Sequence, residues 1–248
     1  MLTRKTYVSE KIKKEAPGVK TLDTGEPIGF GRRLFMAFRI LLFITIIFVL
    51  SSWSLVWAMG WAYIGLWFIV AAIAIQYIAP DTIRERLIIK NNIAGFDKKI
   101  CPVILSLPVL LWMVCGLDER FGWSPEISLP VQLIAFALFF IGHVFTSLAM
   151  IKNKFFSSVV RIQKDRGQVV VDSGPYRLVR HPGYLGGMVS YISTPVALGS
   201  YFALIPAVLY VIALAVRTAY EDDLLKRELL GYLNYAKRVR YRLLPGVW

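Results

Sequence analysis

Six apolar stretches dominate the chain, and each is close to the roughly 20 residues that a helix needs to cross a bilayer. Polar or turn-forming residues separate them, and the connections within the first pair and the last pair are very short. This pattern predicts an all-α protein, a polytopic membrane helical bundle with two tight helical hairpins. The predicted spans are residues 38–58, 61–79, 101–117, 129–151, 184–199 and 201–217.

The segments around these spans divide the chain into three parts. Residues 1–37 are polar and lysine-rich with several glycines and prolines, so we expect a cytoplasmic or interfacial arm. Residues 38–151 hold the first four spans, and residues 152–248 hold a long loop, the last hairpin and a C-terminal segment. From Arg217 onward, apolar residues recur at steps of three and four, which predicts a cytoplasmic amphipathic helix that stops at Pro245. These positions are Leu225, Leu229, Tyr232, Ala236 and Val239.

The basic residues indicate how the spans are oriented. Six crossings would place all 29 Lys and Arg residues on one side of the membrane except Arg120, which lies between the third and fourth spans. By the positive-inside rule, both termini are predicted to be cytoplasmic. The net charge of +13 then follows from orientation and from contact with anionic lipids of the bilayer, so it does not indicate a nucleic-acid partner.

The few cysteines and histidines argue against two kinds of site. Cys101 and Cys115 share one apolar segment, so a disulfide framework does not organise this fold. His143 and His181 lie far apart in the sequence without a carboxylate inside a span, so no metal site is predicted. His143 is deep in the fourth span, where it either makes an interhelical hydrogen bond or contributes to a substrate tunnel.

The most informative stretch is GPYRLVRHPGYLGG, at residues 174–187. Pro182 disfavours a helical conformation at His181 and suits the first turn of a helix, so we expect a helix to begin there. Arg180 and His181 would then lie at the N-terminus of this helix, where backbone N–H groups and the helix dipole favour an anionic group. Glycines in the first turns would allow a ligand or a neighbouring helix to approach the backbone closely.

An acidic cluster follows the last span. Arg217 and Glu221 are four residues apart, so they share a helix face and could pair, and Asp222 comes next. Both ends of the last hairpin return to the same side of the membrane, so these acids can face Arg180 and His181. A pocket with arginines on one wall and carboxylates on the other suits a zwitterionic ligand. The alternative is a solvated acidic end of a helix that is leaving the membrane.

Together the two clusters resemble a known family. GPYRLVRHPGYLGG is similar to the R-H-P-x-Y-x-G signature of the integral-membrane isoprenylcysteine carboxyl methyltransferases, a group that also resembles the phospholipid N-methyltransferases. The downstream string RTAYEDDLLKRELLGYLNYAKRVRYRLLPG resembles the second motif of the same family. The resemblance covers about residues 150–248, and it departs from the family at Asp222, where many members have a second glutamate.

The resemblance implies a methyltransferase that binds S-adenosyl-L-methionine at the cytoplasmic end of the bundle, under the long loop and the C-terminal helix. Matched by position, Arg180 would hold the carboxylate of the acceptor, with Arg217 close by, and Glu221 would complete the catalytic group. The implied cofactor-binding residues are His181, Pro182, Tyr184, Gly186, Glu221 and Asp222. A Rossmann-type cofactor domain is not expected, because the chain has no Gly-rich nucleotide motif.

Several functions remain open on these residues. The expected acceptor is the carboxylate of a lipidic, isoprenylcysteine-like molecule, which the first four spans would admit from the bilayer. A phospholipid amine acceptor would instead require Glu221 or His181 as a base. An NADPH-dependent membrane reductase of the sterol or steroid type carries a similar motif, but often with asparagine and glutamate where this chain has Gly183 and Gly187. A non-catalytic lipid-binding scaffold is the remaining alternative.

Overall fold

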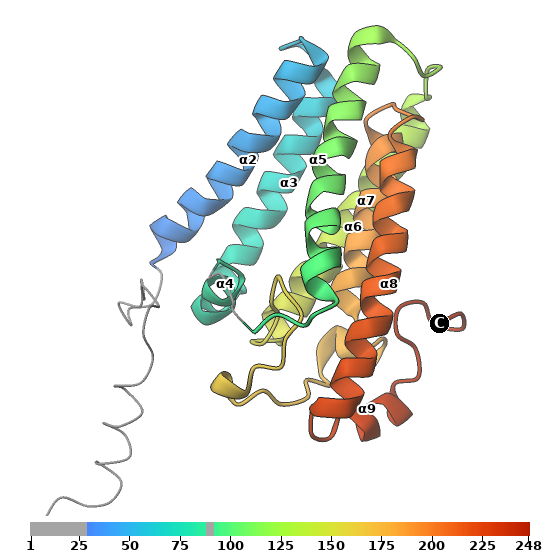
Figure 1. Cartoon of the computed structure of the whole chain (residues 1–248). Helices are drawn as coiled ribbons and strands as arrows, with labels where there is room; N and C mark the ends of the chain where they lie inside the picture. The colour runs from blue at the N-terminus through green and yellow to red at the C-terminus, as the bar shows by residue number, and fades with distance from the viewer. Residues whose placement is uncertain (1–28, 88–91) are drawn as a thin grey trace, which may run out of the picture.

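The computed structural model describes residues 29–87 and 92–248, which form an all-α bundle of long helices lying side by side (Figure 1). The described residues contain eight α-helices and two short 3₁₀ helices. The α-helices are α2 (Phe30–Ser52), α3 (Ala58–Tyr77), α4 (Pro80–Leu87), α5 (Asp97–Phe121), α6 (Leu129–Lys152), α7 (Pro182–Ala197), α8 (Leu204–Glu228) and α9 (Tyr232–Arg238). The 3₁₀ helices are η1 (Lys164–Arg166) and η2 (Gly174–Arg177).

Five of these helices, α2, α3, α5, α6 and α8, are long and apolar enough to cross a membrane. They confirm the predicted multi-pass helical class. The predicted span 184–199 corresponds to α7, which has 16 residues and is not among the five. Large apolar side chains cover the outside of the bundle, as expected for a surface that faces lipid tails. More than half exposed are, for example, Leu50, Ile73, Leu105, Ile134 and Ile212.

The structure places two helix boundaries differently from the sequence-based spans. Helix α2 begins at Phe30, so the end of the predicted arm 1–37 is helical, while residues 1–28 lie outside the described residues. The predicted amphipathic helix from Arg217 is not a separate element, because α8 runs without a break from Leu204 to Glu228. It ends before Gly231, whose φ of 85° is strained for any residue with a Cβ. The short helix α9 follows and ends at Arg238, before the predicted end at Pro245.

Helices α6 and α7 pack closely against each other. A Cβ on Gly142 would lie 2.6 Å from the carbonyl oxygen of Gly186, and a Cβ on Gly186 would lie 2.5 Å from the carbonyl oxygen of Gly142. The hydroxyl of Thr146 donates a hydrogen bond to the backbone oxygen of Gly183 at 3.2 Å. His143 Nδ1 lies 2.8 Å from the hydroxyl of Ser190, which is the predicted interhelical hydrogen bond. Small residues therefore fix α7 against α6.

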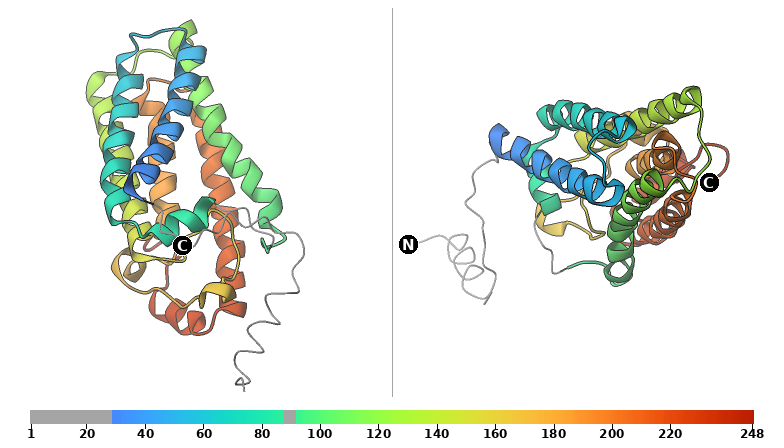
Figure 2. Two further views of the ribbon diagram at one scale, coloured as in Figure 1. Left: turned by 90° about the vertical axis from the view of Figure 1, so that its left-hand side faces the viewer. Right: turned by 90° about the horizontal axis from the view of Figure 1, so that it is seen from above.

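The two ends of the bundle differ. One end has only short connections, whereas the other carries α4, the loop 153–181, α9 and the C-terminal residues (Figures 1 and 2). A buried cluster that includes Phe48, Tyr63, Trp112 and Phe139 joins α2, α3, α5 and α6. The indole of Trp112 donates to the hydroxyl of Tyr63 at 3.1 Å. The same cluster includes Ala197 at the end of α7 and Ala207 in the first turn of α8, so it packs the short connection between these helices against the bundle.

Candidate active site

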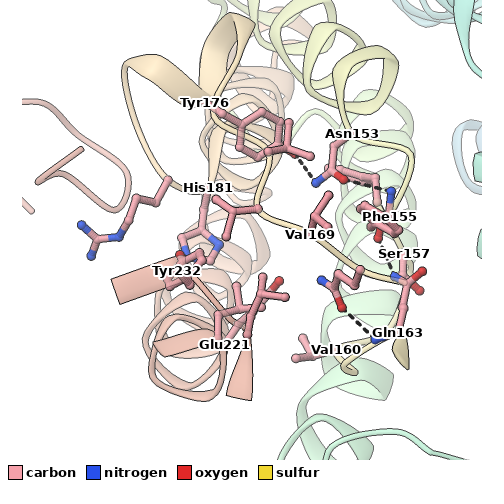
Figure 3. A pocket seen from close by; sticks show the side chains of 18 of the residues that line it. Asn153, Phe155, Ser157, Val160, Gln163, Val169, Tyr176, His181, Glu221 and Tyr232 are labelled. Atoms are coloured by element: carbon pink, nitrogen blue, oxygen red, sulfur yellow. Dashed lines mark hydrogen bonds between the residues drawn. The ribbon is translucent and has the colours of Figure 1, made fainter. Parts of the chain in front are cut away.

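A cavity lies at the loop-rich end of the bundle (Figure 3). It contains about 820 Å³ of space not filled by protein atoms, part of it open to solvent. Its walls come from residues 153–171, from the segment around Tyr176 to Tyr184, and from α8 and α9. In Figure 3, His181, Glu221 and Tyr232 lie on one side of the cavity, and Asn153, Phe155 and Gln163 lie on the other.

The motif 174–187 reaches the cavity because a helix begins at Pro182. His181 is the N-cap residue of α7, with a non-helical backbone (φ −123°, ψ 61°), as a residue before proline prefers. The backbone N–H groups of Arg180 and His181 donate to the carbonyl oxygens of Tyr241 and Arg242 at 3.0 and 2.9 Å. The C-terminal residues therefore hold the start of the motif in place.

Asp222 is the centre of a buried charge cluster beside the cavity. Its side chain has no exposed surface, and Arg180 donates two hydrogen bonds to it, at 2.7 and 3.0 Å. Arg242, Lys226 and the hydroxyl of Tyr232 bind the same carboxylate at 2.9, 2.7 and 2.9 Å. Burial alone would lower the pKa of Arg180, but its hydrogen bonds to Asp222 outweigh burial and raise that pKa above the ordinary value.

The two predicted catalytic arginines are already bound to the protein. The remaining donor nitrogen of Arg180 bonds the backbone oxygens of Val239 and Arg240, at 2.8 and 2.7 Å. Arg217 binds Asp97 on α5 at 2.8 and 2.9 Å rather than the predicted Glu221, and it also donates to a backbone oxygen at 2.8 Å. Both guanidinium groups are buried and neutralised, which does not favour either as a free carboxylate clamp.

The carboxylate of Glu221 has a different environment from that of Asp222. The hydroxyl of Tyr184 donates to one oxygen of the Glu221 carboxylate, and no ion pair joins Glu221 to any basic group that the structure describes. The side chain is half-buried and lines the cavity. The rings of Tyr184 and His181 are nearly parallel, with centroids 5.7 Å apart. The cavity therefore has one carboxylate that can still bind a cationic group.

The opposite wall of the cavity comes from the long loop that begins at Asn153. The buried side chain of Gln163 donates to the backbone oxygen of Phe155 at 2.6 Å and accepts a bond from Arg166, also at 2.6 Å. Asn153 donates to the hydroxyl of Tyr176 at 3.0 Å. Tyr176 has a raised pKa because it is buried, so it is neutral at physiological pH. These bonds give the loop a defined shape although it contains little helix.

The sequence-predicted site residues fall into two groups. Those that line the cavity are Arg180, His181, Tyr184 and Glu221, which confirms that the two motifs meet at one place. Those that are absent from the described lining are Pro182, Gly186, Arg217 and Asp222. Pro182 begins α7, Gly186 faces α6, and the other two form buried ion pairs. For Pro182, Gly186 and Asp222, a direct cofactor contact stays a prediction that the lining does not support.

Fold and site define a multi-pass helical membrane protein with a polar-lined ligand cavity at one end of the bundle. Residues 133–227, from α6 to the end of α8, match the model of the isoprenylcysteine carboxyl methyltransferase (ICMT) family. This region of the chain is therefore similar to that family. The matched region contains His181, Tyr184 and Glu221, but it excludes α4 and α9.

Individual proteins show a similarity to the same family. Two rice proteins, from Oryza sativa subsp. indica and subsp. japonica, are each described as a "Probable protein-S-isoprenylcysteine O-methyltransferase" and are 30% identical over 113 residues. These matches cover 44% of this chain and 59% of each rice protein. The Arabidopsis thaliana "Protein-S-isoprenylcysteine O-methyltransferase B" is 29% identical over 174 residues, which cover 68% of this chain and 82% of that protein.

Proposed function

We propose that this protein is an integral-membrane methyltransferase that moves a methyl group from S-adenosyl-L-methionine to the carboxylate of a lipidic, isoprenylcysteine-like acceptor. One observation carries the proposal. The motif at the start of α7 and Glu221 of α8 line one cavity and are joined by the hydrogen bond between Tyr184 and Glu221, inside the region that matches the ICMT family.

The residues of the cavity fit this cofactor chemically. The cofactor has an ammonium, a carboxylate, a sulfonium and an adenine, so its site needs a negative group, hydrogen-bond donors and apolar walls. Glu221 supplies the negative group, and His181 supplies a ring nitrogen at the N-terminus of α7. Valines at 159, 160 and 169–171 supply apolar surface.

The reaction makes modest demands on the protein. A cofactor bound beside Glu221 and His181 would supply an electrophilic methyl group for an acceptor carboxylate oxygen, with the cofactor's thioether as the leaving group. No proton moves, because the acceptor is already ionised at neutral pH. The chain must align the reactants and exclude water, which can contribute several orders of magnitude in rate. The ordered loop 153–171 and helix α9 cover the cavity and serve this purpose.

The decisive experiment measures cofactor binding and product together. Calorimetry on the purified protein should detect S-adenosyl-L-methionine binding and no NADPH binding, since a sterol-type reductase predicts the reverse. Incubation with methyl-labelled cofactor and an S-prenylated cysteine should then give a labelled product. Release of the label by base identifies an ester and excludes a methylamine. A protein that ignores the cofactor at millimolar concentration would contradict the proposal.

Glu221→Gln tests the assigned cofactor contact. Loss of a charge-assisted interaction costs about 1.5–3 kcal/mol, so the dissociation constant for S-adenosyl-L-methionine should rise about 10- to 100-fold. The thermal midpoint should stay close to that of the wild type, because Glu221 is half-buried and forms no ion pair within the described residues. Asp223→Asn on the same helix is the control and should bind like the wild type. Unchanged affinity in Glu221→Gln would remove this residue from the site.

A further inference from the structure

After α9 the chain turns back toward the bundle and ends beside α8 (Figures 1 and 2). Residues 243–248 form a closed loop there, which we call the C-terminal loop. The N–H of Leu243 donates to the backbone oxygen of Trp248 at 3.0 Å, and the N–H of Trp248 donates to that of Leu244 at 3.1 Å. Gly246, with a φ of 81°, makes the tight turn between them. The loop is therefore a defined structure.

The C-terminal loop lies among membrane-spanning segments. Leu243 is almost fully buried in an apolar cluster that α5, α7 and α8 form. The other buried members of this cluster are Ile104, Leu107, Met188, Tyr210 and Leu214, and all five lie within the spans predicted from the sequence. Leu214 precedes Arg217 by about one helical turn. The cluster, and Leu243 with it, is thus on the apolar side of the level at which α8 becomes polar.

Two apolar side chains of the loop are not covered by the protein. Val247 is 77% exposed and Leu244 is 49% exposed. The outer surface of α8 is also apolar near this level, where Ile212 and Val216 are exposed. Lipid is the natural cover for an apolar surface of this kind beside membrane-spanning helices.

The residues that lead into the loop carry positive charge that fits anionic headgroups. Residues 229–248 contain Lys237, Arg238, Arg240 and Arg242 but no Asp or Glu. Arg240 is exposed and forms no ion pair with any residue that the structure describes. The guanidinium carbon of Arg242 lies 4.9 Å from the ring centroid of Trp248. An apolar tip with basic and aromatic flanks is typical of a segment that lies in the interface of an anionic bilayer.

We propose that the C-terminal loop is a contact surface for anionic phospholipids. Leu244 and Val247 enter the leaflet at the cavity end of the bundle, and Arg240 binds the negatively charged headgroups there. This proposal goes beyond the proposed methyl transfer and does not depend on it.

The loop is also joined to the candidate active site. The N–H groups of Arg180 and His181 donate to the backbone oxygens of Tyr241 and Arg242, the two residues before the loop. Arg242 also binds the buried carboxylate of Asp222 at 2.9 Å. Lipid contact with the loop therefore stabilises the start of the motif 174–187, which lines the cavity.

Fluorescence measures whether the loop is inserted. Val247→Cys in a cysteine-free, full-length background is labelled with an environment-sensitive dye and placed in nanodiscs of phosphatidylcholine and phosphatidylglycerol. The dye should emit at a shorter wavelength than in water, and lipids with brominated acyl chains should quench it. The matched control is Leu230→Cys, which is 96% exposed between α8 and α9 and should be neither shifted nor quenched. Equal behaviour of the two dyes would overturn the proposal.

Hydrogen exchange measures whether lipid contact reaches the motif. The amide hydrogens of Arg180 and His181 are the probes, because both bond to the segment before the loop. In these nanodiscs Val247→Asp should accelerate their exchange about 10-fold, the change expected when the burial of one valine side chain is lost. Leu230→Asp should leave it unchanged. Nanodiscs without phosphatidylglycerol should also give faster exchange, and high salt should remove the difference between the two lipid compositions.

A loop that only the protein holds predicts a different result. Because the side chain of Val247 is mostly exposed, Val247→Asp would then leave the exchange of both amides unchanged. That result, or exchange that does not respond to phosphatidylglycerol, would overturn the assignment of anionic lipid. Neither measurement uses a methyl donor or acceptor, so the outcome is independent of the proposed reaction.

Discussion

Glu221 and Asp222 are adjacent in the sequence, yet their carboxylates have opposite surroundings. Asp222 has no exposed surface and accepts bonds from Arg180, Lys226 and Arg242, whereas Glu221 is half-buried and bonded to one tyrosine. The adjacent positions point about 100° apart on α8, so one faces the C-terminal segment and the other faces the cavity. We infer that Asp222 holds the site together and that Glu221 contacts the ligand.

Asp222→Asn should destabilise the protein by about 3–5 kcal/mol, because it leaves the buried charge of Arg180 without its anion. The midpoint of unfolding in detergent should fall accordingly, and less protein should be recovered. Asp223→Asn is the matched control, since its carboxylate is 58% exposed and its nearest cations lie at 3.8 and 4.0 Å. That control should change stability by less than about 0.5 kcal/mol. Equal effects of the two substitutions would contradict the structural role of Asp222.

For single residues, the sequence correctly predicts that the basic and acidic side chains lie near one another, but it does not predict which of them form ion pairs. The spacing of Arg217 and Glu221 correctly predicts a shared helix face, but Arg217 is bound to Asp97, which is 120 positions away in the chain. A tertiary partner of this kind depends on how α5 packs against α8, and local spacing carries no such information.

At the level of helices, the contact between α6 and α7 fixes the position of α7, whose first residues carry the motif 174–187. Gly186→Ala would push a methyl group against the backbone of Gly142, where a Cβ comes within 2.5 Å of a carbonyl oxygen. Overpacking of this kind costs about 1–3 kcal/mol, so the thermal midpoint should fall.

Gly187→Ala is a control inside the same motif. The nearest atom to a Cβ at that position is the hydroxyl of Tyr210 at 3.6 Å, an ordinary contact. Alanine is also the better helix former by about 1 kcal/mol, so this variant should be as stable as the wild type or more so. If the Gly186→Ala and Gly187→Ala variants have the same thermal midpoint, α6 and α7 can move apart without loss of stability, which contradicts this prediction.

The helical elements were largely predictable, because long apolar runs have few alternatives in a membrane. The C-terminal end of α8 was not predictable. Hydrophobic patterning changes near Arg217 from uniformly apolar to amphipathic, but no glycine or proline interrupts residues 207–230, so the backbone continues as one helix. The shape of the loop 153–171 was also not predictable, because buried side chains such as Gln163 determine it by bonding to the backbone.

For the whole molecule, the distribution of basic residues predicts that the cavity faces the cytoplasm. Single cysteines introduced at exposed positions in a cysteine-free background can test this orientation. Arg177→Cys lies at the cavity end, and Glu126→Cys lies in the connection between α5 and α6. A membrane-impermeant maleimide should label Glu126→Cys in intact cells but Arg177→Cys only after lysis. The opposite pattern would reverse the predicted topology.

Helix α8 is one unbroken rod of 25 residues, about 37 Å long, whereas the hydrocarbon layer is about 30 Å thick. Its first turns belong to the lipid-facing bundle, and its last turns carry Glu221 and Leu225 into the wall of the cavity. We infer that a change in tilt imposed by a thicker or thinner bilayer is transmitted along this helix to the wall of the cavity. The thickness of the surrounding lipid would then alter the shape of the cavity directly.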